Sequence, residues 1–259
     1  LRLSTGESVK AKYVLIATGG TPNHGEAIPG IEHVISSNEV FHLKTFPKRI
    51  VIQGGGYIAL EFACIFAGLG ADVTVIYRGE NILRGFDEDV RKHVRSEMEK
   101  AGITILTGCI VSKVEKHGES FTAHLSSGSS VAADQVMFAV GRHPNVKGLE
   151  LEKAGVALNP VNGGIAVNEF SQTNVPNIYA VGDVTHRINL TPVAIREGHA
   201  FADTVFGGRP VQVDHADIPT AVFTQPEVGT VGLTEAEARA QYTHVDIYKT
   251  DFRSLKSTL

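Results

Sequence analysis

The alternation of apolar and polar positions along the chain predicts strands and helices in regular succession. Short runs rich in β-branched and other apolar residues stop at glycine or polar positions, as buried strands do. The strands expected in the first half are Tyr13–Ala17, Arg49–Gln53, Ala71–Tyr77 and Ile103–Leu106. Helices are expected from the glycines 54–56 to about Leu69 and over Asp87–Lys100. This strand–helix alternation predicts a parallel α/β sheet.

The pattern changes in the second half of the chain. Short alternating runs divided by polar turns predict an antiparallel meander over Cys109–Ala139. Asn162-Gly163-Gly164 predicts a further hairpin between two apolar triplets. The remaining elements expected are a strand over Ile178–Val181, a helix from Thr191 to about Phe206, a strand over Thr220–Phe223 and a helix from Thr234.

Composition narrows the class of protein. With 259 residues, 42% hydrophobic and 20% charged, the chain is typical of a globular protein with two domains or one large one. Its net charge of −4 argues against a nucleic-acid partner. The longest apolar stretch, Ile58–Tyr77, is broken by Glu61 and Asp72, so no membrane span is expected. Two distant cysteines and scattered histidines predict neither a disulfide framework nor a metal site.

The two ends of the chain carry their own prediction. Leu1 is not preceded by an initiator Met, and no signal peptide is recognisable after it. The last residues, Lys256–Leu259, contain no closing helix or turn signal. We therefore expect a segment of a longer, cytoplasmic protein.

The clearest chemical motif follows the strand that ends at Gln53. Gly54-x-Gly56-x-x-Ala59 opens the next helix, and each small residue has a physical purpose. Gly54 permits a tight turn, Gly56 allows a pyrophosphate to approach the backbone, and Ala59 permits close helix packing. Free N–H groups and the positive helix end favour phosphate binding. A glycine-rich turn without a ligand is the alternative.

The residues after the next strand indicate which dinucleotide would bind. NAD sites usually carry Asp or Glu there to bind the ribose 2′-hydroxyl, but this chain has Tyr77-Arg78, and Arg84 follows six residues later. Two guanidinium groups provide charged donors for a 2′-phosphate. This predicts NADPH, the alternative being two solvated surface arginines.

With these motifs the chain resembles the pyridine nucleotide–disulfide oxidoreductases, and within that family it is most similar to the glutathione reductases. The segments that carry the resemblance occur in family order over nearly the whole chain. They are Ala17–Pro22, Gly54–Ala63, Tyr77–Asp87, Ala139–Asn145, Thr173–Thr185, Leu190–Gly198 and Pro219–Glu235.

The resemblance implies a fold in which a Rossmann-like NAD(P)H-binding domain with a three-stranded meander is inserted in an FAD-binding domain of the same α/β type. Residues 1–22 would end the first FAD segment, and residues 23–143 would form the NADPH domain. Residues 144–213 would return to the FAD domain. Residues 214–259 would begin an α+β interface domain that forms a homodimer.

The resemblance also assigns residues to the cofactors. Tyr57 matches a tyrosine that covers the nicotinamide pocket and moves when NADPH enters, although an aromatic residue packed at a helix start is the alternative. Ile58 and Glu61 match positions at the nicotinamide end, and Gly141 matches a close approach of backbone to dinucleotide. A purely structural role stays open for the neighbouring Arg142.

The second half carries the match to the FAD site. Gly182-Asp183 ends a predicted strand and would place a carboxylate against a polyol hydroxyl, although such turns are common without a ligand. Thr191-Pro192 is typical of an N-cap followed by proline at the first helical position. A helix start there would stabilise negative charge on a reduced flavin.

The activity implied is transfer of reducing equivalents from NADPH through FAD to a redox disulfide and then to glutathione disulfide. The redox cysteine pair and the acid/base histidine are expected outside this segment, which by itself would be inactive. Cys64 and Cys109 are predicted to be buried, unreactive residues. His199 stands where some glutathione reductases have an arginine, which leaves the exact disulfide open.

Alternatives for the function stay open at this point. A thioredoxin or mercuric reductase on the same scaffold is one, and a non-catalytic NADPH-binding module is another. Lipoamide dehydrogenase is disfavoured because its NAD site would need an acid near Arg78.

Overall fold

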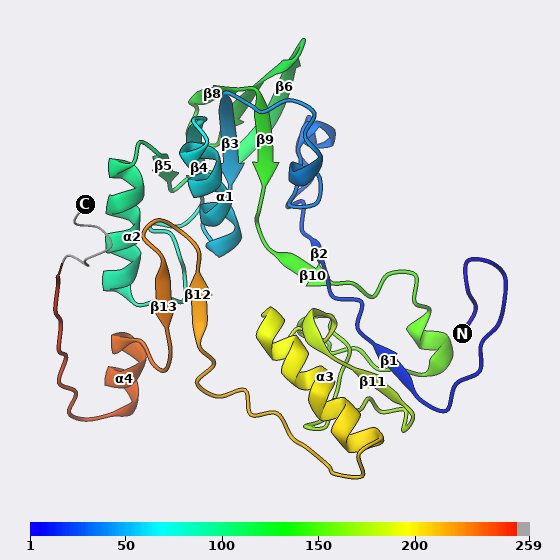
Figure 1. The fold of residues 1–259 in the computed structure, drawn as a ribbon. Helices are drawn as coiled ribbons and strands as arrows, with labels where there is room; N and C mark the ends of the chain where they lie inside the picture. The colour runs from blue at the N-terminus through cyan, green and yellow to red at the C-terminus, as the bar shows by residue number, and fades with distance from the viewer. Residues whose placement is uncertain (253–259) are drawn as a thin grey trace.

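The structure is a computed structural model that describes residues 1–252. Its largest element is a four-stranded parallel sheet with the order β5-β4-β3-β9 (Figure 1). The strands are β3 (Arg49–Gln53), β4 (Asp72–Tyr77), β5 (Thr104–Thr107) and β9 (Gln135–Phe138). Helix α1 (Tyr57–Gly68) connects β3 to β4, and α2 (Glu88–Lys100) connects β4 to β5. The predicted parallel α/β sheet is confirmed.

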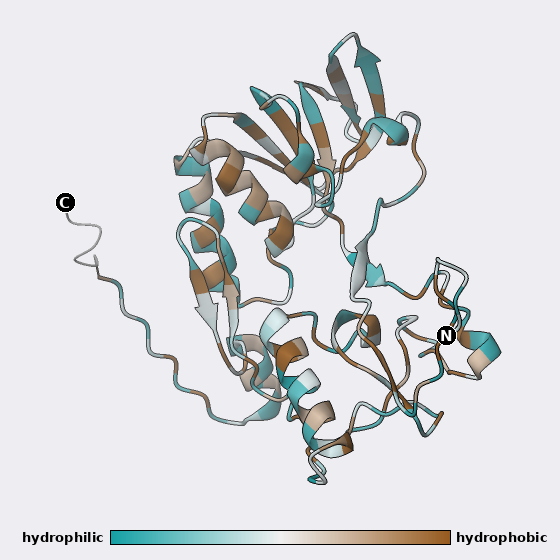
Figure 2. Cartoon of the chain, turned by 45° about the vertical axis from the view of Figure 1, so that its right-hand side comes forward, coloured by the Kyte–Doolittle hydropathy of each residue, from teal (hydrophilic) through white to brown (hydrophobic). Residues whose placement is uncertain are grey.

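The sequence explains why these elements form. Strand β3 is buried at four of its five positions, as is typical of a parallel strand covered on both faces. Helix α1 is apolar along most of its length (Figure 2), and its side chains pack against β3 and β4. Asp87 caps α2 by accepting a hydrogen bond from the Asp89 N–H at 3.0 Å.

The predicted meander is only partly correct. Strands β6 (Val111–His117), β7 (Ser120–Leu125) and β8 (Ser130–Ala133) form an antiparallel sheet. The predicted range continued to Ala139, but Gln135–Phe138 is β9 and pairs in parallel with β3. Three consecutive residues of β9 are buried, so this run belongs to a covered sheet and does not continue the alternation of the meander.

A second α/β unit joins segments that are far apart in the sequence. Strand β1 (Val14–Ile16) pairs in parallel with β11 (Ile178–Ala180), beside α3 (Thr191–Val205) (Figure 1). Aromatic side chains pack between them, with the rings of Tyr179 and Phe201 centred 5.1 Å apart. The chain therefore leaves this unit after β1 and returns to it after more than half its length.

The two segments of chain that connect these units pair with each other. Strand β2 (Gly20–Pro22) pairs antiparallel with β10 (Arg142–Pro144), which the sequence did not predict. The Arg142 guanidinium donates hydrogen bonds to the Gly20 carbonyl and to the Ser37 hydroxyl. Arg142 therefore has a structural role, which the sequence analysis had left open: it ties the β2–β10 pair to the segment around Ser37.

The last described segment forms a hairpin and a short helix. Strand β12 (Thr220–Val222) pairs with β13 (Val228–Thr230), and α4 (Glu235–Gln241) follows. Thr234 and Glu237 form the capping box that opens α4 at the predicted position. The hairpin predicted around Gly163 is reduced to a single bridge between Leu158 and Ile165. The part of the chain that the structure describes also contains four short 3₁₀ turns, at Ile31–His33, Val40–His42, Leu151–Ala154 and Gly182–Thr185 (η4).

Candidate functional site

The glycine turn after β3 has the geometry that the motif predicts. Gly54 has a φ of 150°, and a Cβ built there would lie 2.3 Å from the Ala139 carbonyl oxygen and 2.9 Å from the Ala59 Cβ. Only glycine fits between β3, β9 and α1 at this point. Gly56 is the N-cap of α1, and space is open where its side chain would be. No side chain caps this helix, so its first N–H groups are available to an anionic ligand.

The two arginines predicted to bind a 2′-phosphate lie in the loop that follows β4. Both Arg78 and Arg84 are exposed, whereas Arg91 and Arg95 on the adjacent helix form ion pairs with glutamates. The Leu83 N–H donates a hydrogen bond to the Gly55 carbonyl at 2.7 Å. This bond holds the residue before Arg84 against the glycine turn, so one arginine lies beside the helix end.

Tyr57 lies within a group of charged residues drawn from three elements. Burial raises the pKa of its hydroxyl above the usual value, and the negative charges of Asp183 and Glu61 raise it further. Arg142 acts in the opposite direction. The side chain is 36% exposed, so it is packed but not enclosed. The first residue of α1 thus faces the Gly182–Asp183 turn of the other α/β unit.

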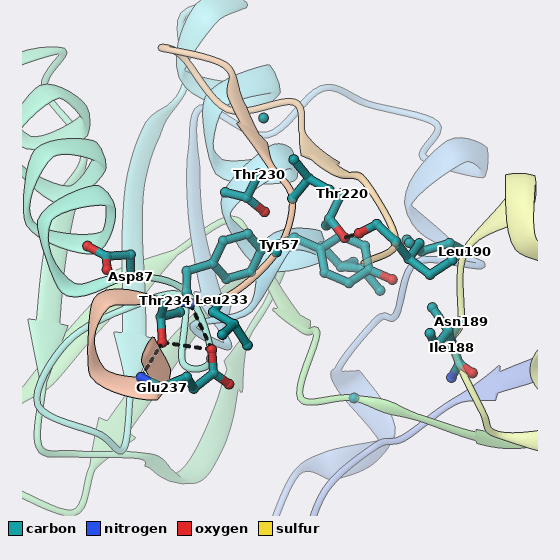
Figure 3. Close-up of a pocket in the computed structure, with 18 of the residues that line it drawn as sticks. Tyr57, Asp87, Ile188, Asn189, Leu190, Thr220, Thr230, Leu233, Thr234 and Glu237 are labelled. Carbon is teal, nitrogen blue, oxygen red and sulfur yellow. Dashed lines mark hydrogen bonds between the residues drawn. The ribbon is translucent and has the colours of Figure 1, made fainter. Parts of the chain in front are cut away.

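A cleft of about 730 Å³ lies between the two units and collects predicted residues from both. It is lined by Tyr57, Ile58, Glu61, Gly182, Asp183 and Thr191, among others. A second cavity of about 1060 Å³ continues from it toward α4 and contains Gly141. Figure 3 shows Tyr57 near the middle of this second cavity, with residues 188–190 on one side and Thr234 and Glu237 on the other. The remaining predicted residues, Gly54, Gly56, Arg78 and Arg84, lie at the carboxyl ends of β3 and β4.

Asn189 is a cleft residue with a distinct chemical environment that the sequence did not indicate. The Asn189 side-chain oxygen is buried and has no hydrogen-bond partner among the described residues. Asn189 lines both cavities, between η4 and the start of α3. A buried amide oxygen without a donor is costly, and a ligand donor in the cleft would satisfy it. The signal available in the sequence was only its position two residues before Thr191.

Two sequence expectations differ from the structure in detail. Thr191 is the first residue of α3, and Leu190 is its N-cap without a side-chain hydrogen bond, so Thr191 does not cap the helix as predicted. The helix start therefore leaves its own N–H groups uncapped next to the cleft. Glu61 lines the cleft, but one of its oxygens also accepts a hydrogen bond from the Phe223 N–H at 2.9 Å. That bond links α1 to the β12–β13 hairpin.

Neither cysteine has the surroundings of a reactive thiol. Cys64 is half-buried on α1 and Cys109 is buried, and no disulfide joins them. Burial raises the pKa of both thiols, which disfavours the thiolate needed for disulfide exchange. Among the described residues, no group of three or more histidine, cysteine and acidic side chains is arranged to hold a metal ion. None of the helices within residues 1–252 has the length and apolar character needed to cross a membrane.

Comparison with known proteins decides the family. The family model described as pyridine nucleotide-disulphide oxidoreductase matches residues 2–198. The chain belongs to this family. The dimerisation domain of the same family matches residues 218–259. The resemblance inferred from the sequence motifs is therefore confirmed.

The chain is similar in sequence to named reductases and in structure to a flavoprotein disulfide reductase. Glutathione reductases of Burkholderia cepacia and Nostoc sp. are 49% and 51% identical, over 98% and 95% of this chain and 56% of each relative. Trypanothione reductase of Trypanosoma congolense is 46% identical, over 96% of this chain and 51% of the relative. The structure of the flavoprotein disulfide reductase RclA from Escherichia coli matches with a TM-score of 0.86 and 29% identity, covering 92% of this chain and 55% of RclA. The chain spans about half the length of the relatives it matches.

Tyr57 offers a test of the cleft. We expect Tyr57→Ala to lower the free energy of unfolding by about 1–2 kcal/mol, less than for a fully buried ring, because the residue is 36% exposed. The expectation that Tyr57 covers a nicotinamide pocket further predicts that the rate of flavin reduction by NADPH, measured in the full-length protein, changes several-fold. Stopped-flow absorbance and thermal unfolding measure the two effects. A large fall in melting temperature with unchanged reduction kinetics would assign Tyr57 a packing role alone.

Proposed function

We propose that this chain is the cofactor-binding part of an NADPH-dependent flavoprotein disulfide reductase, with glutathione disulfide as its substrate. The observation that carries this proposal is the cleft in which Tyr57 of one α/β unit faces Gly182 and Asp183 of the other. In a reductase of this kind the hydride donor and the flavin must come into contact, and a cleft lined by both units is a place where two cofactors bound to different units can do so. The names of the glutathione reductases and of RclA support the same function.

The domain division proposed follows the path of the chain. Residues 1–22 and 144–213 would form parts of an FAD domain, since β1 and β11 pair although they are far apart in sequence. Residues 23–143 would form the NADPH domain around the parallel sheet. Residues 214–259 would begin the domain through which two subunits associate, in keeping with the dimerisation-domain match. A cytoplasmic location is part of this proposal, although a relative from Pisum sativum is named as chloroplastic/mitochondrial.

NADPH would bind at the carboxyl ends of β3 and β4. Gly54 and Gly56 leave the start of α1 open to the pyrophosphate, and the helix N–H groups would donate to it. Arg78 and Arg84 would bind the 2′-phosphate through charged hydrogen bonds. The nicotinamide end would lie in the two cavities described above, beside Gly141 in the larger one and beside Glu61 in the cleft. Tyr57 and Ile58 line both cavities.

FAD would be held by the second unit. Asp183 would accept a hydrogen bond from a polyol hydroxyl, with Gly182 providing the close approach. The uncapped start of α3 at Thr191 would stabilise negative charge near the flavin pyrimidine, and the unpartnered Asn189 oxygen would accept a further hydrogen bond. When bound, FAD supplies the two-electron chemistry that connects NADPH to a disulfide. The residues of this chain bind and orient the two cofactors.

The choice of substrate is tested with the full-length protein. We expect NADPH-dependent reduction of glutathione disulfide to exceed that of trypanothione disulfide, thioredoxin or mercuric ion in kcat/KM. His199 is exposed on α3 in the position where some glutathione reductases carry arginine, so His199→Arg should alter KM for the disulfide more than kcat. Preference for another of these substrates would replace glutathione disulfide and leave the reductase function in place.

The cysteines of this chain provide a separate test. We expect Cys64→Ser in the full-length protein to retain nearly full turnover, because Cys64 packs in α1 with a raised thiol pKa. Substitution of the redox cysteines outside this segment should abolish turnover while FAD stays bound. Loss of turnover in Cys64→Ser, with FAD bound and circular dichroism unchanged, would overturn the proposed reaction path.

A further inference from the structure

A buried carboxylate lies behind the cleft rather than in it. Glu197 is in the middle of α3 and only 1% exposed, yet it accepts hydrogen bonds from two groups and forms an ion pair with a third. The Gly182 N–H lies 2.7 Å from one oxygen. The Arg187 guanidinium and the His215 Nε2 lie 2.8 Å and 2.7 Å from the other. A buried charge of this kind persists only where its oxygens are hydrogen-bonded.

The Glu197 oxygen that accepts from the Gly182 N–H fixes the backbone at the start of η4. Gly182 has a φ of 72°, and a Cβ there would lie 3.1 Å from the Ala194 Cβ on α3. The turn is therefore pressed directly against the helix that carries Glu197. Asp183, the next residue, lines the cleft where the flavin is proposed to bind. The Glu197–Gly182 hydrogen bond thus fixes the backbone immediately before the Asp183 carboxylate.

The second oxygen of Glu197 joins two further segments. Arg187 lies in the loop between η4 and α3, and it also donates to the Ser171 hydroxyl at 3.0 Å. His215 lies in the segment that leads from α3 to β12, and thus into the part matched by the dimerisation domain. One carboxylate therefore connects the Gly182–Asp183 turn, the loop after it and the segment that leads to the C-terminal unit, which consists of β12, β13 and α4.

We propose that Glu197 is a positioning residue that holds the Gly182–Asp183 turn in its flavin-binding conformation, and that His215 couples this turn to the segment entering the C-terminal unit. This inference rests on the proposed flavin function of Asp183. Glu197 lines neither of the two cavities; it acts through the Gly182 N–H. A carboxylate is required because one oxygen must accept from a backbone amide while the other accepts from His215 and pairs with the Arg187 charge.

The requirement for two acceptor oxygens defines the decisive variant. In Glu197→Gln, the side-chain NH₂ must face either the Gly182 N–H or the Arg187 and His215 donors, so one donor meets another. We expect FAD to dissociate from the full-length protein about tenfold faster, as for the loss of a buried charged hydrogen bond. The visible circular dichroism of the remaining bound flavin should also change. Glu169→Gln, at an exposed position of the same unit, is the matched control and should match the wild type.

His215 provides a second pair of variants that does not depend on the folding of Glu197→Gln. His215→Gln keeps a side-chain N–H donor and should retain FAD nearly as the wild type does. His215→Leu removes the donor and should release FAD several-fold faster. A purely structural effect would lower the melting temperature of both variants without this rescue by glutamine.

The outcomes separate the inference from the proposed function. Release of FAD, followed by flavin fluorescence after dilution, is compared in all variants and the wild type. If the wild type binds FAD and Glu197→Gln has the same release rate and flavin spectrum, the positioning role is wrong and the proposed function stands. If His215→Leu behaves as His215→Gln, the coupling to the C-terminal unit is wrong. If the wild type binds no FAD, the proposed function fails and this inference fails with it.

Discussion

Gly54→Ala is expected to destabilise the protein by about 2–4 kcal/mol, the combined effect of a strained backbone and an overpacked contact. The new methyl group would lie 2.3 Å from the carbonyl oxygen of Ala139, the residue directly after β9. This oxygen belongs to the backbone, so it cannot move away by a side-chain rotation. The φ of 150° adds strain for any residue other than glycine. Chemical denaturation of the purified protein, monitored by circular dichroism, measures the loss.

Gly56→Ala is the matched control for that result. Its φ of −89° suits alanine, and nothing lies within 4 Å of the added Cβ. The free energy of unfolding should therefore change by less than about 0.5 kcal/mol. NADPH binding should weaken about tenfold, because the methyl group occupies the space through which the pyrophosphate would approach the helix start. If Gly56→Ala leaves NADPH affinity unchanged, the glycine turn does not hold the dinucleotide.

Arg78→Ala and Arg84→Ala should each weaken NADPH binding by about 1.5–3 kcal/mol, or about 10- to 150-fold in Kd, as expected for charged hydrogen bonds to a phosphate. Both side chains are exposed and neither contributes an ion pair to the described fold, so unfolding should be little affected. NADH lacks the 2′-phosphate, and its Kd should change less than about twofold. Isothermal titration with both nucleotides gives the comparison.

A lysine on the neighbouring helix controls for general charge. Lys92→Ala removes one exposed positive charge from α2, and it should weaken NADPH and NADH binding equally and slightly. Equal losses for the two nucleotides in Arg78→Ala and Arg84→Ala would contradict the assignment of the 2′-phosphate site.

The local sequence pattern was enough to predict much of the fold. Strand β3 was predicted with the bounds observed, because a strand covered on both faces is a continuous apolar run. The helix predicted from Thr234 is confirmed as α4, whose capping box lies within the four residues Thr234–Glu237 and is therefore a local feature of the sequence. The glycine turn was predicted for the same reason, since its backbone requirement is local.

What the sequence did not predict depends on contacts between distant residues. Strand β9 was assigned to the meander because its neighbour along the chain is β8, whereas its partner in space is β3. The hydrogen bond between Glu61 and the Phe223 N–H spans 162 positions, and no periodicity marks either end. Glu197 follows the same rule: its two hydrogen-bond donors and its ion-pair partner lie on segments whose proximity only the folded chain establishes.

The pairing of β2 with β10 has a consequence for protein engineering. Pro22 and Arg142 are partners in this antiparallel pair, so the chain leaves the β1–β11 unit and re-enters it at points about one strand spacing apart. The intervening residues 23–141 therefore form an insertion whose first and last residues lie close together in space. Such closely spaced ends are the condition under which a domain can be excised or transplanted into a host. Transfer of residues 23–141 as one segment would therefore need a tight turn to close the gap left in the donor. It would also need polar residues on the segment where Val222 and Val228 of the β12–β13 hairpin now cover its core.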